Sequence, residues 1–166
     1  TSATTSRLFK KQLYEHAKLT GFINDSMTLG FACHDFSMRG MGGIEASKIS
    51  GMAHLISFAG TESVPALSAI EEYYNTDANK ELVAATVPAT EHSIECSNAI
   101  FNEDGSVDEY AYFNRLLDLF PTGIVSIVSD GFDYWNVIEN ILPNLKERIH
   151  GRNGRVVIRP DSGNPV

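Results

Sequence analysis

Short apolar runs rich in β-branched residues alternate with longer amphipathic segments, and this alternation limits the fold of the chain more than any other feature. Strands of a parallel sheet are buried on both faces and are joined by crossover helices. The pattern therefore predicts βα units and an α/β fold class with a parallel sheet. We expect strands at about residues 28–33, 56–58, 84–88, 123–129 and 155–158. We expect helices at about residues 6–19, 44–55, 62–74, 108–120 and 133–149, the last one kinked at Pro143.

Length and charge exclude several classes of protein. The chain has 166 residues, 43% of them apolar, and shows no linker, so we treat residues 1–166 as a single segment. A complete α/β barrel needs about 250 residues, so this chain can form only part of one. The net charge of −8 argues against a broad basic surface for nucleic acid. No run approaches the ~20 apolar residues of a membrane-spanning helix.

The two cysteines, Cys33 and Cys96, lie far apart and lack the spacing of a metal site. We expect both to be buried free thiols in a reducing compartment, which favours the cytoplasm. The first residue is Thr1 and not Met, and the last residues fall in a polar loop. We therefore expect a processed or cut segment of a longer protein.

Charged and polar side chains follow four of the predicted strands. They are His34 and Asp35, then Glu91 and His92, then Ser129 and Asp130, and finally Arg159 and Asp161. Charged groups at the carboxyl ends of successive parallel strands are typical of the catalytic face of an α/β barrel. A doubly wound sheet also binds its ligands at that edge. The pattern therefore predicts one functional face.

The first of these groups continues as a glycine-rich turn. Phe36 and Arg39 precede Gly40, Gly42 and Gly43, which lead into a predicted helix. An aromatic ring beside an arginine can stack a flat ligand, and a helix N-terminus can bind phosphate. The spacing matches neither the dinucleotide fingerprint nor the P-loop. A glycine-rich turn with a surface arginine explains the same residues without a ligand.

Two further groups carry residues suited to proton or phosphoryl chemistry. His92 can act as a general base, contact a phosphate or accept a phosphoryl group. Alternatively, it is a structural residue at a helix N-cap. Asp130 can bind magnesium, a ribose hydroxyl or a histidine, or it can cap the following helix. Ser126 lies in the preceding strand, on the same face as Val128.

The run from Arg159 to Pro165 places a cation, an anion, a hydroxyl group and a flexible backbone within one turn. Arg159 can neutralise a diphosphate, and Asp161 can bind ribose hydroxyls or a magnesium-bound phosphate. The alternative is a turn held by a local pair between Arg159 and Asp161. Together, the four groups predict a site for a sugar phosphate and a metal.

Five motifs occur in an order that matches a known family. They are His34-Asp35-Phe36 with Arg39-Gly40, Ala53-His54-Leu55 with Phe58 and residues 60–64, residues 87–93, residues 125–130, and residues 158–165. These motifs resemble those of the nicotinamide phosphoribosyltransferase family. They run through nearly the whole chain but cover only the middle portion of a family member.

The resemblance implies transfer of a phosphoribosyl group from phosphoribosyl pyrophosphate to nicotinamide, which gives nicotinamide mononucleotide and pyrophosphate for NAD salvage. It implies an irregular (β/α) barrel of the type II phosphoribosyltransferase kind and a homodimer with active sites at its interface. It also implies that Mg²⁺ is a cofactor and that ATP is a coupled phosphoryl donor.

The same resemblance implies how four residues bind the substrates. Phe36 corresponds to the aromatic that stacks on one face of the nicotinamide ring. Arg39 and Arg159 correspond to contacts to the ring and the diphosphate. Ser126 corresponds to a serine that lines the pocket.

Three more residues are implied to take part in catalysis. His92 corresponds to the histidine that ATP phosphorylates. Asp130 corresponds to its hydrogen-bonding partner or to a magnesium-site residue, and Asp161 to the contact for ribose and magnesium. Magnesium and arginine would stabilise the negative charge on the leaving pyrophosphate.

Glu62 stands where the resemblance leads us to expect an aspartate that accepts a hydrogen bond from the nicotinamide amide. A carboxylate there favours nicotinamide over nicotinate, which it repels. Alternatively, Glu62 lies in the first turn of its helix, where acidic residues are favoured. Two other functions stay open: a nicotinate phosphoribosyltransferase, and a non-catalytic fragment that associates with a full-length enzyme. We expect the isolated segment to have weak or no turnover.

Overall fold

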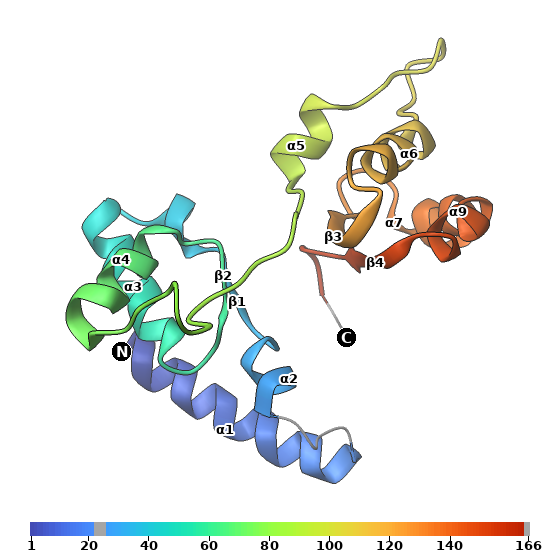
Figure 1. Ribbon diagram of the computed structural model, residues 1–166. Coiled ribbons are helices and arrows are strands. Elements are labelled where there is room, and N and C mark those ends of the chain that lie inside the picture. The colour runs from blue at the N-terminus through green and yellow to red at the C-terminus, as the bar shows by residue number, and fades with distance from the viewer. Residues whose placement is uncertain (22–25, 165–166) are drawn as a thin grey trace. The chain divides into compact units, whose positions relative to one another are not determined.

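A computed structural model describes residues 1–21 and 26–164 (Figure 1). The chain divides into two compact units, unit 1 (Thr1–Thr86) and unit 2 (Val87–Val166). Each unit combines helices with a pair of parallel strands, which confirms the α/β character predicted from the sequence. Assignment of the chain to one barrel segment stays a prediction. Pro165, the last residue of the final motif, lies outside the described residues.

Unit 1 is mainly helical and contains one short parallel pair. Its elements are α1 (Ser2–Thr20), α2 (Ser26–Gly30), β1 (His34–Asp35), the 3₁₀-helix η1 (Ser37–Gly40), α3 (Ile44–Leu55), β2 (Gly60–Thr61) and α4 (Pro65–Tyr74). His34 pairs with Gly60, and Asp35 pairs with Thr61. A further parallel bridge joins Gly60 to Ala85. The strand ends that carry the first and second motifs are therefore neighbours.

The strands predicted in unit 1 are misplaced. Residues 26–30 form α2 instead of a strand, and pairing begins only at His34. Residues 56–58 form the turn after α3, and the strand follows at Gly60. The predicted strand at residues 84–88 is reduced to isolated bridges at Ala85 and Ala89. Apolar runs this short fit a buried turn or helix as well as a strand, so composition alone could not place the pairing.

Close packing between α3 and α4 explains why α3 contains a glycine, Gly51. A Cβ atom added to Gly51 would lie 2.6 Å from the Cβ atom of Ala66 on α4. The core here consists of Leu55, Ala66 and Ile70. Helix α4 begins at Pro65 and not at about residue 62 as predicted, because proline fits the first position of a helix.

Unit 2 contains the longer parallel pair. Its elements are α5 (His92–Ser97), α6 (Glu109–Leu119), β3 (Thr122–Val128), α7 (Tyr134–Asn136), the π-helix η2 (Val137–Ile141), α8 (Leu142–Asn144), α9 (Lys146–His150) and β4 (Asn153–Arg159). Strands β3 and β4 pair from Thr122 and Asn153 through to Val128 and Arg159. A bridge from Ala89 to Ser126 covers the other edge of β3.

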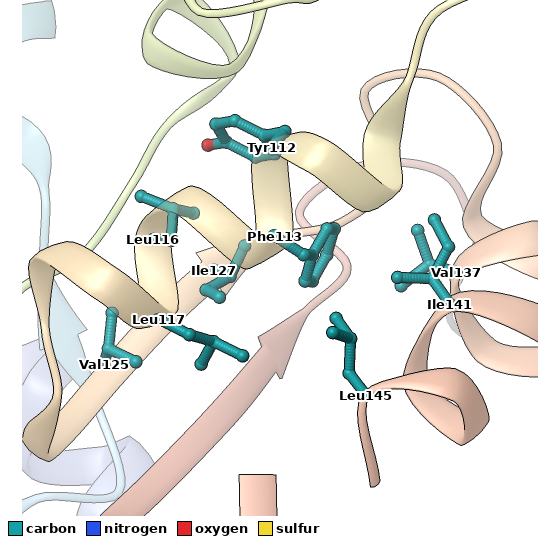
Figure 2. Close-up of a cluster of buried hydrophobic side chains, with 9 residues drawn as sticks. All are labelled: Tyr112, Phe113, Leu116, Leu117, Val125, Ile127, Val137, Ile141 and Leu145. Atoms are coloured by element: carbon teal, nitrogen blue, oxygen red, sulfur yellow. The ribbon is translucent and has the colours of Figure 1, made fainter. Parts of the chain in front are cut away.

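The core of unit 2 lies between α6, β3 and the helices that follow β3. Figure 2 shows the α6 side chains facing those of β3 and of the segment from η2 to Leu145. The buried residues are Tyr112, Phe113, Leu116, Leu117, Val125, Ile127, Val137, Ile141 and Leu145. The helix expected at about residues 108–120 is confirmed as α6, and the Asp108 carboxylate caps it by accepting the Ala111 N–H at 2.9 Å.

The predicted disturbance at Pro143 is also found. The single helix expected at 133–149 is divided into α7, η2, α8 and α9. Proline supplies no N–H to the preceding turn, and the residues before it adopt π-helical pairing. This segment still presents Val137, Ile141 and Leu145 to the core.

Both cysteines are free, as predicted, but Cys96 is exposed and Cys33 only half-buried, so the predicted burial is wrong. Cys96 lies on the short helix α5, which the strand prediction did not foresee. Within residues 1–21 and 26–164, no helix has the length and apolar character needed to cross a membrane.

Candidate functional site

A histidine–aspartate pair forms the centre of the candidate site in unit 2. His92 is the first residue of α5, and its Nε2 atom lies 3.0 Å from Oδ1 of Asp130. An ionised carboxylate can only accept, so Nε2 carries the hydrogen of this bond. Nδ1 lies 3.8 Å from Oδ2 of Asp161. Glu91, and not His92, holds the N-cap position.

The second oxygen of Asp130 anchors the loop after β4. Oδ2 accepts hydrogen bonds from the Asp161 N–H at 2.9 Å, the Ser162 N–H at 2.7 Å and the Ser162 hydroxyl at 2.7 Å. Burial alone would raise the pKa of Asp130, but the hydrogen bonds from Ser162, Asp161 and His92 lower it to about 2. The carboxylate is therefore ionised at neutral pH.

Asp130 does not cap the following helix. The cap of α7 is Asp133, whose carboxylate accepts the Asn136 N–H at 3.0 Å. The alternative in which Asp130 is a helix-capping residue is therefore wrong. Both oxygens of Asp130 are occupied by the four hydrogen bonds that join it to His92, Asp161 and Ser162.

Arg159 lies at the end of β4, beside the histidine–aspartate pair. Its guanidinium donates to the carbonyl oxygen of Thr90, and its Nε lies 3.4 Å from Oδ1 of Asp161. The local pair between Arg159 and Asp161 is therefore formed, as the structural alternative required. The Asp161 carboxylate is still 41% exposed, which leaves it accessible to a ligand.

Strand register explains why these residues meet. Val128 pairs with Arg159, so β3 and β4 end side by side. Thr90 joins the same edge, because its hydroxyl accepts the Val128 N–H at 2.9 Å and its own N–H donates to Ser126 at 2.9 Å. The segments that end at Val128, Arg159 and Thr90 therefore have their carboxyl ends at the same edge of the sheet. Parallel sheets bind their ligands at this edge. Ser126 lies inside β3, with only 8% of its surface exposed.

One buried acid at this site was not foreseen from the sequence. Glu95 lies one turn after His92 on α5 and is 1% exposed. Burial and the charge of Glu109 raise the pKa of Glu95 to about 7, which the nearby His92 opposes. A polar residue at the spacing i, i+3 from a candidate histidine was the available signal, but it is too common to be decisive.

Mg²⁺ prefers oxygen ligands, and the candidate ligands at this site are the carboxylates of Asp130 and Asp161. In the described residues, no group of three or more His, Cys, Asp or Glu side chains could hold a metal ion. Asp130 fits poorly as a ligand, because its oxygens are taken by hydrogen bonds. The exposed carboxylate of Asp161 fits, because Mg²⁺ keeps several waters and takes one or two carboxylates together with substrate phosphates.

Unit 1 carries the ring-binding candidates. Phe36 follows β1, and its ring stacks on that of His34 with centroids 5.9 Å apart. Arg39 lies in η1 and is exposed. Asp35 ties the turn down, because its Oδ1 accepts the Ser37 N–H at 2.9 Å and its Oδ2 accepts the Thr61 hydroxyl at 3.4 Å.

Glu62 is bound to the same turn. Its N–H donates to the Asp35 carbonyl at 2.9 Å, and its Oε1 accepts the Thr86 hydroxyl at 3.0 Å. Because α4 begins only at Pro65, Glu62 is not in the first turn of a helix, and that alternative is wrong. The residue as a whole is half-buried, while its carboxylate contact to Thr86 is exposed.

Comparison with known proteins identifies the family. Residues 31–166 match the nicotinate phosphoribosyltransferase (NAPRTase) family. The chain belongs to this family. It is 41% identical to the nicotinamide phosphoribosyltransferase of Acinetobacter baylyi, over 100% of this chain and 32% of that protein. It is 34% identical to the protein of the same name from Mycoplasma genitalium, over 99% of this chain and 32% of that protein.

A third relative agrees with these two. The nicotinamide phosphoribosyltransferase of Xanthomonas campestris pv. campestris is 37% identical over 83% of this chain and 28% of that protein. The chain thus spans about a third of the length of the curated relatives that it matches. The resemblance seen in the motifs is confirmed at the level of the family.

Proposed function

We propose that this chain is part of an enzyme that transfers a phosphoribosyl group from phosphoribosyl pyrophosphate to nicotinamide, giving nicotinamide mononucleotide and pyrophosphate. One observation carries the proposal. His92, Asp130, Arg159 and Asp161 meet at the carboxyl ends of parallel strands, in a chain 41% identical to a protein named nicotinamide phosphoribosyltransferase. An irregular (β/α) barrel and a homodimer belong to the same proposal.

In unit 2, the proposed roles follow from charge and exposure. Arg159 supplies a cation for the diphosphate, and the exposed carboxylate of Asp161 faces ribose hydroxyls or a magnesium-bound phosphate. Mg²⁺, when bound through Asp161, would neutralise charge on the leaving pyrophosphate. Ser126 is proposed to line the pocket, although its side chain is nearly buried.

His92 is proposed as the residue that ATP phosphorylates. Its Nε2 donates to Asp130, so Nδ1 carries the lone pair when the ring is neutral. The Nδ1–P bond would form as the bond between the γ-phosphorus and its bridging oxygen breaks, and ADP would leave. Asp130 holds the imidazole during this step and stabilises positive charge on the ring. We propose no direct metal contact for Asp130.

In unit 1, we propose that Phe36 stacks on the nicotinamide ring and that Arg39 contacts the ring or the diphosphate. Glu62 is proposed to accept a hydrogen bond from the nicotinamide amide. Its carboxylate would repel the carboxylate of nicotinate. The family also includes enzymes for nicotinate, as its description says, so substrate preference needs its own test. The cytoplasmic location stays a prediction from the sequence.

A hybrid enzyme tests the proposal. In it, this chain replaces the matching third of the Acinetobacter baylyi relative. We expect the hybrid to form nicotinamide mononucleotide from nicotinamide and phosphoribosyl pyrophosphate, and to prefer nicotinamide to nicotinate. Glu62→Arg should shift that preference toward nicotinate. A folded hybrid that turns over neither substrate, beside an active unmodified relative, would overturn the proposed function.

A further inference from the structure

Glu95 is a buried carboxyl group for which the proposed reaction has no direct use. Glutamate is almost never fully buried unless it is paired, yet Glu95 is 1% exposed. Within the described residues, neither of its oxygens meets a hydrogen-bond donor at ordinary geometry. The Gly131 N–H nevertheless lies close enough to lower its pKa. A leucine would fill the same volume without a desolvation cost, so this carboxyl group calls for an explanation.

The carboxyl group occupies the space that Gly131 leaves open. A Cβ atom added to Gly131 would lie 1.9 Å from Oε2 and 2.6 Å from Cδ of Glu95. The φ angle of Gly131 lies outside the left-handed region, so its backbone conformation does not itself demand glycine. A side chain at position 131 would have to displace the carboxyl group of Glu95 on α5, which lies against the Gly131 backbone.

Both residues of this contact lie close in sequence to the histidine–aspartate pair. Gly131 directly follows Asp130, and Glu95 lies one helical turn after His92, with its N–H donating to Glu91 at 2.9 Å. The charged groups that act on Glu95 are Glu109 of α6, His92 of its own helix and Asp130. A shift of Glu95 would therefore move α5 relative to the turn that holds Asp130.

We propose that Glu95 is a positioning residue: its carboxyl group, seated against Gly131, holds α5 on the Asp130 turn and so fixes the hydrogen bond between His92 and Asp130. The contact is steric, because the carboxyl group fills the space beside the Gly131 backbone. The significance of the pair for turnover rests on the proposed function, but the positioning itself does not.

The first test is a double-mutant cycle on the chain itself. Unfolding in urea is followed by far-UV circular dichroism, because Trp135, the only tryptophan, is 67% exposed in the folded chain and would report little change. We expect Gly131→Ala to lower the urea midpoint clearly in the wild-type background. It should leave the midpoint nearly unchanged in the Glu95→Ala background, where the added methyl group finds room. Glu95→Gln keeps the shape, so Gly131→Ala should still lower the midpoint in that variant.

The second test reads the histidine directly, without substrates. Long-range ¹H–¹⁵N correlation spectra distinguish the two tautomers of His92. We expect one tautomer, with the hydrogen on Nε2, in the wild type and in Glu95→Gln. Glu95→Ala should give a mixture, and the exposed control Glu147→Ala should give the wild-type spectrum.

Two results would overturn the positioning role. One is a Gly131→Ala effect of equal size in the wild-type and Glu95→Ala backgrounds. The other is an unchanged His92 spectrum in Glu95→Ala. Neither measurement involves the reaction. If the hybrid forms no nicotinamide mononucleotide while the mutant cycle and the spectra behave as expected, the proposed function is wrong and the positioning role of Glu95 stands.

Discussion

Replacing Asp130 by asparagine should destabilise unit 2 by an amount that the structure allows us to work out. The pKa of Asp130 falls from an ordinary 3.8 to about 2, which corresponds to roughly 2 kcal/mol of stability at neutral pH. Solvent beside the exposed loop of Asp161 and Ser162 reduces this to about 1–2 kcal/mol. Asparagine offers one acceptor, and its NH₂ group would face N–H donors from His92 or from that loop.

The sign of the pH dependence follows from the lowered pKa. The stabilisation is fully present above pH 3.8 and is lost as the pH falls through about 2, when the carboxylate takes up its proton in the folded state. The difference between the wild type and Asp130→Asn should therefore be constant from pH 7 to about pH 5 and shrink below pH 4.

Urea unfolding followed by far-UV circular dichroism measures this difference. Asp104→Asn is a matched control, because the exposed Asp104 also accepts the N–H and the hydroxyl of a serine, at 2.9 and 2.6 Å. We expect a much smaller effect there. Equal stability of wild type and Asp130→Asn at pH 7 would refute the reasoning, as would a difference that persists unchanged at pH 3.

Two further predictions concern buried carboxyl groups. The pKa of Glu95 is raised from 4.5 to about 7, so the stability that this group contributes is fully present below pH 4.5 and should fall by up to about 3 kcal/mol as the pH rises through 7. Glu95→Gln should remove this loss. If the wild type and Glu95→Gln show the same change in urea midpoint from pH 5 to 8, the prediction is contradicted. Asp35→Asn should raise the KM of the hybrid for nicotinamide several-fold more than that for phosphoribosyl pyrophosphate, because Asp35 ties the Phe36 turn to Thr61. Asp77→Asn, at an exposed turn with a similar contact to Asn79, should leave both constants unchanged.

The longer elements could be predicted from the sequence because their patterns are long enough to have a period. Helix α6 and strands β3 and β4 lie within a residue or two of the predicted ranges. The short strands could not be placed, because two paired residues such as His34 and Asp35 leave no periodic signal.

The candidate site shows the same division. Because polar residues follow the predicted parallel strands, the sequence predicted that they would lie at one edge of the sheet. In unit 2, His92, Asp130 and Asp161 do meet there. The sequence could not show which oxygen of Asp130 accepts from which donor. It also could not show that Glu95 is buried against Gly131. Such contacts depend on how α5 packs on the turn after β3, which no local pattern encodes.

The most direct test of the account is the kcat/KM of the hybrid for phosphoribosyl pyrophosphate, measured with and without Asp161→Asn. The Asp161 N–H that binds Asp130 is kept in the variant, and the asparagine oxygen can still accept from Arg159, so the variant should keep the loop in place. If the exposed Asp161 carboxylate binds ribose or a magnesium-bound phosphate, kcat/KM should fall by roughly 100-fold while the urea midpoint changes little. A folded variant with kcat/KM within about twofold of the parent hybrid would contradict the proposed site.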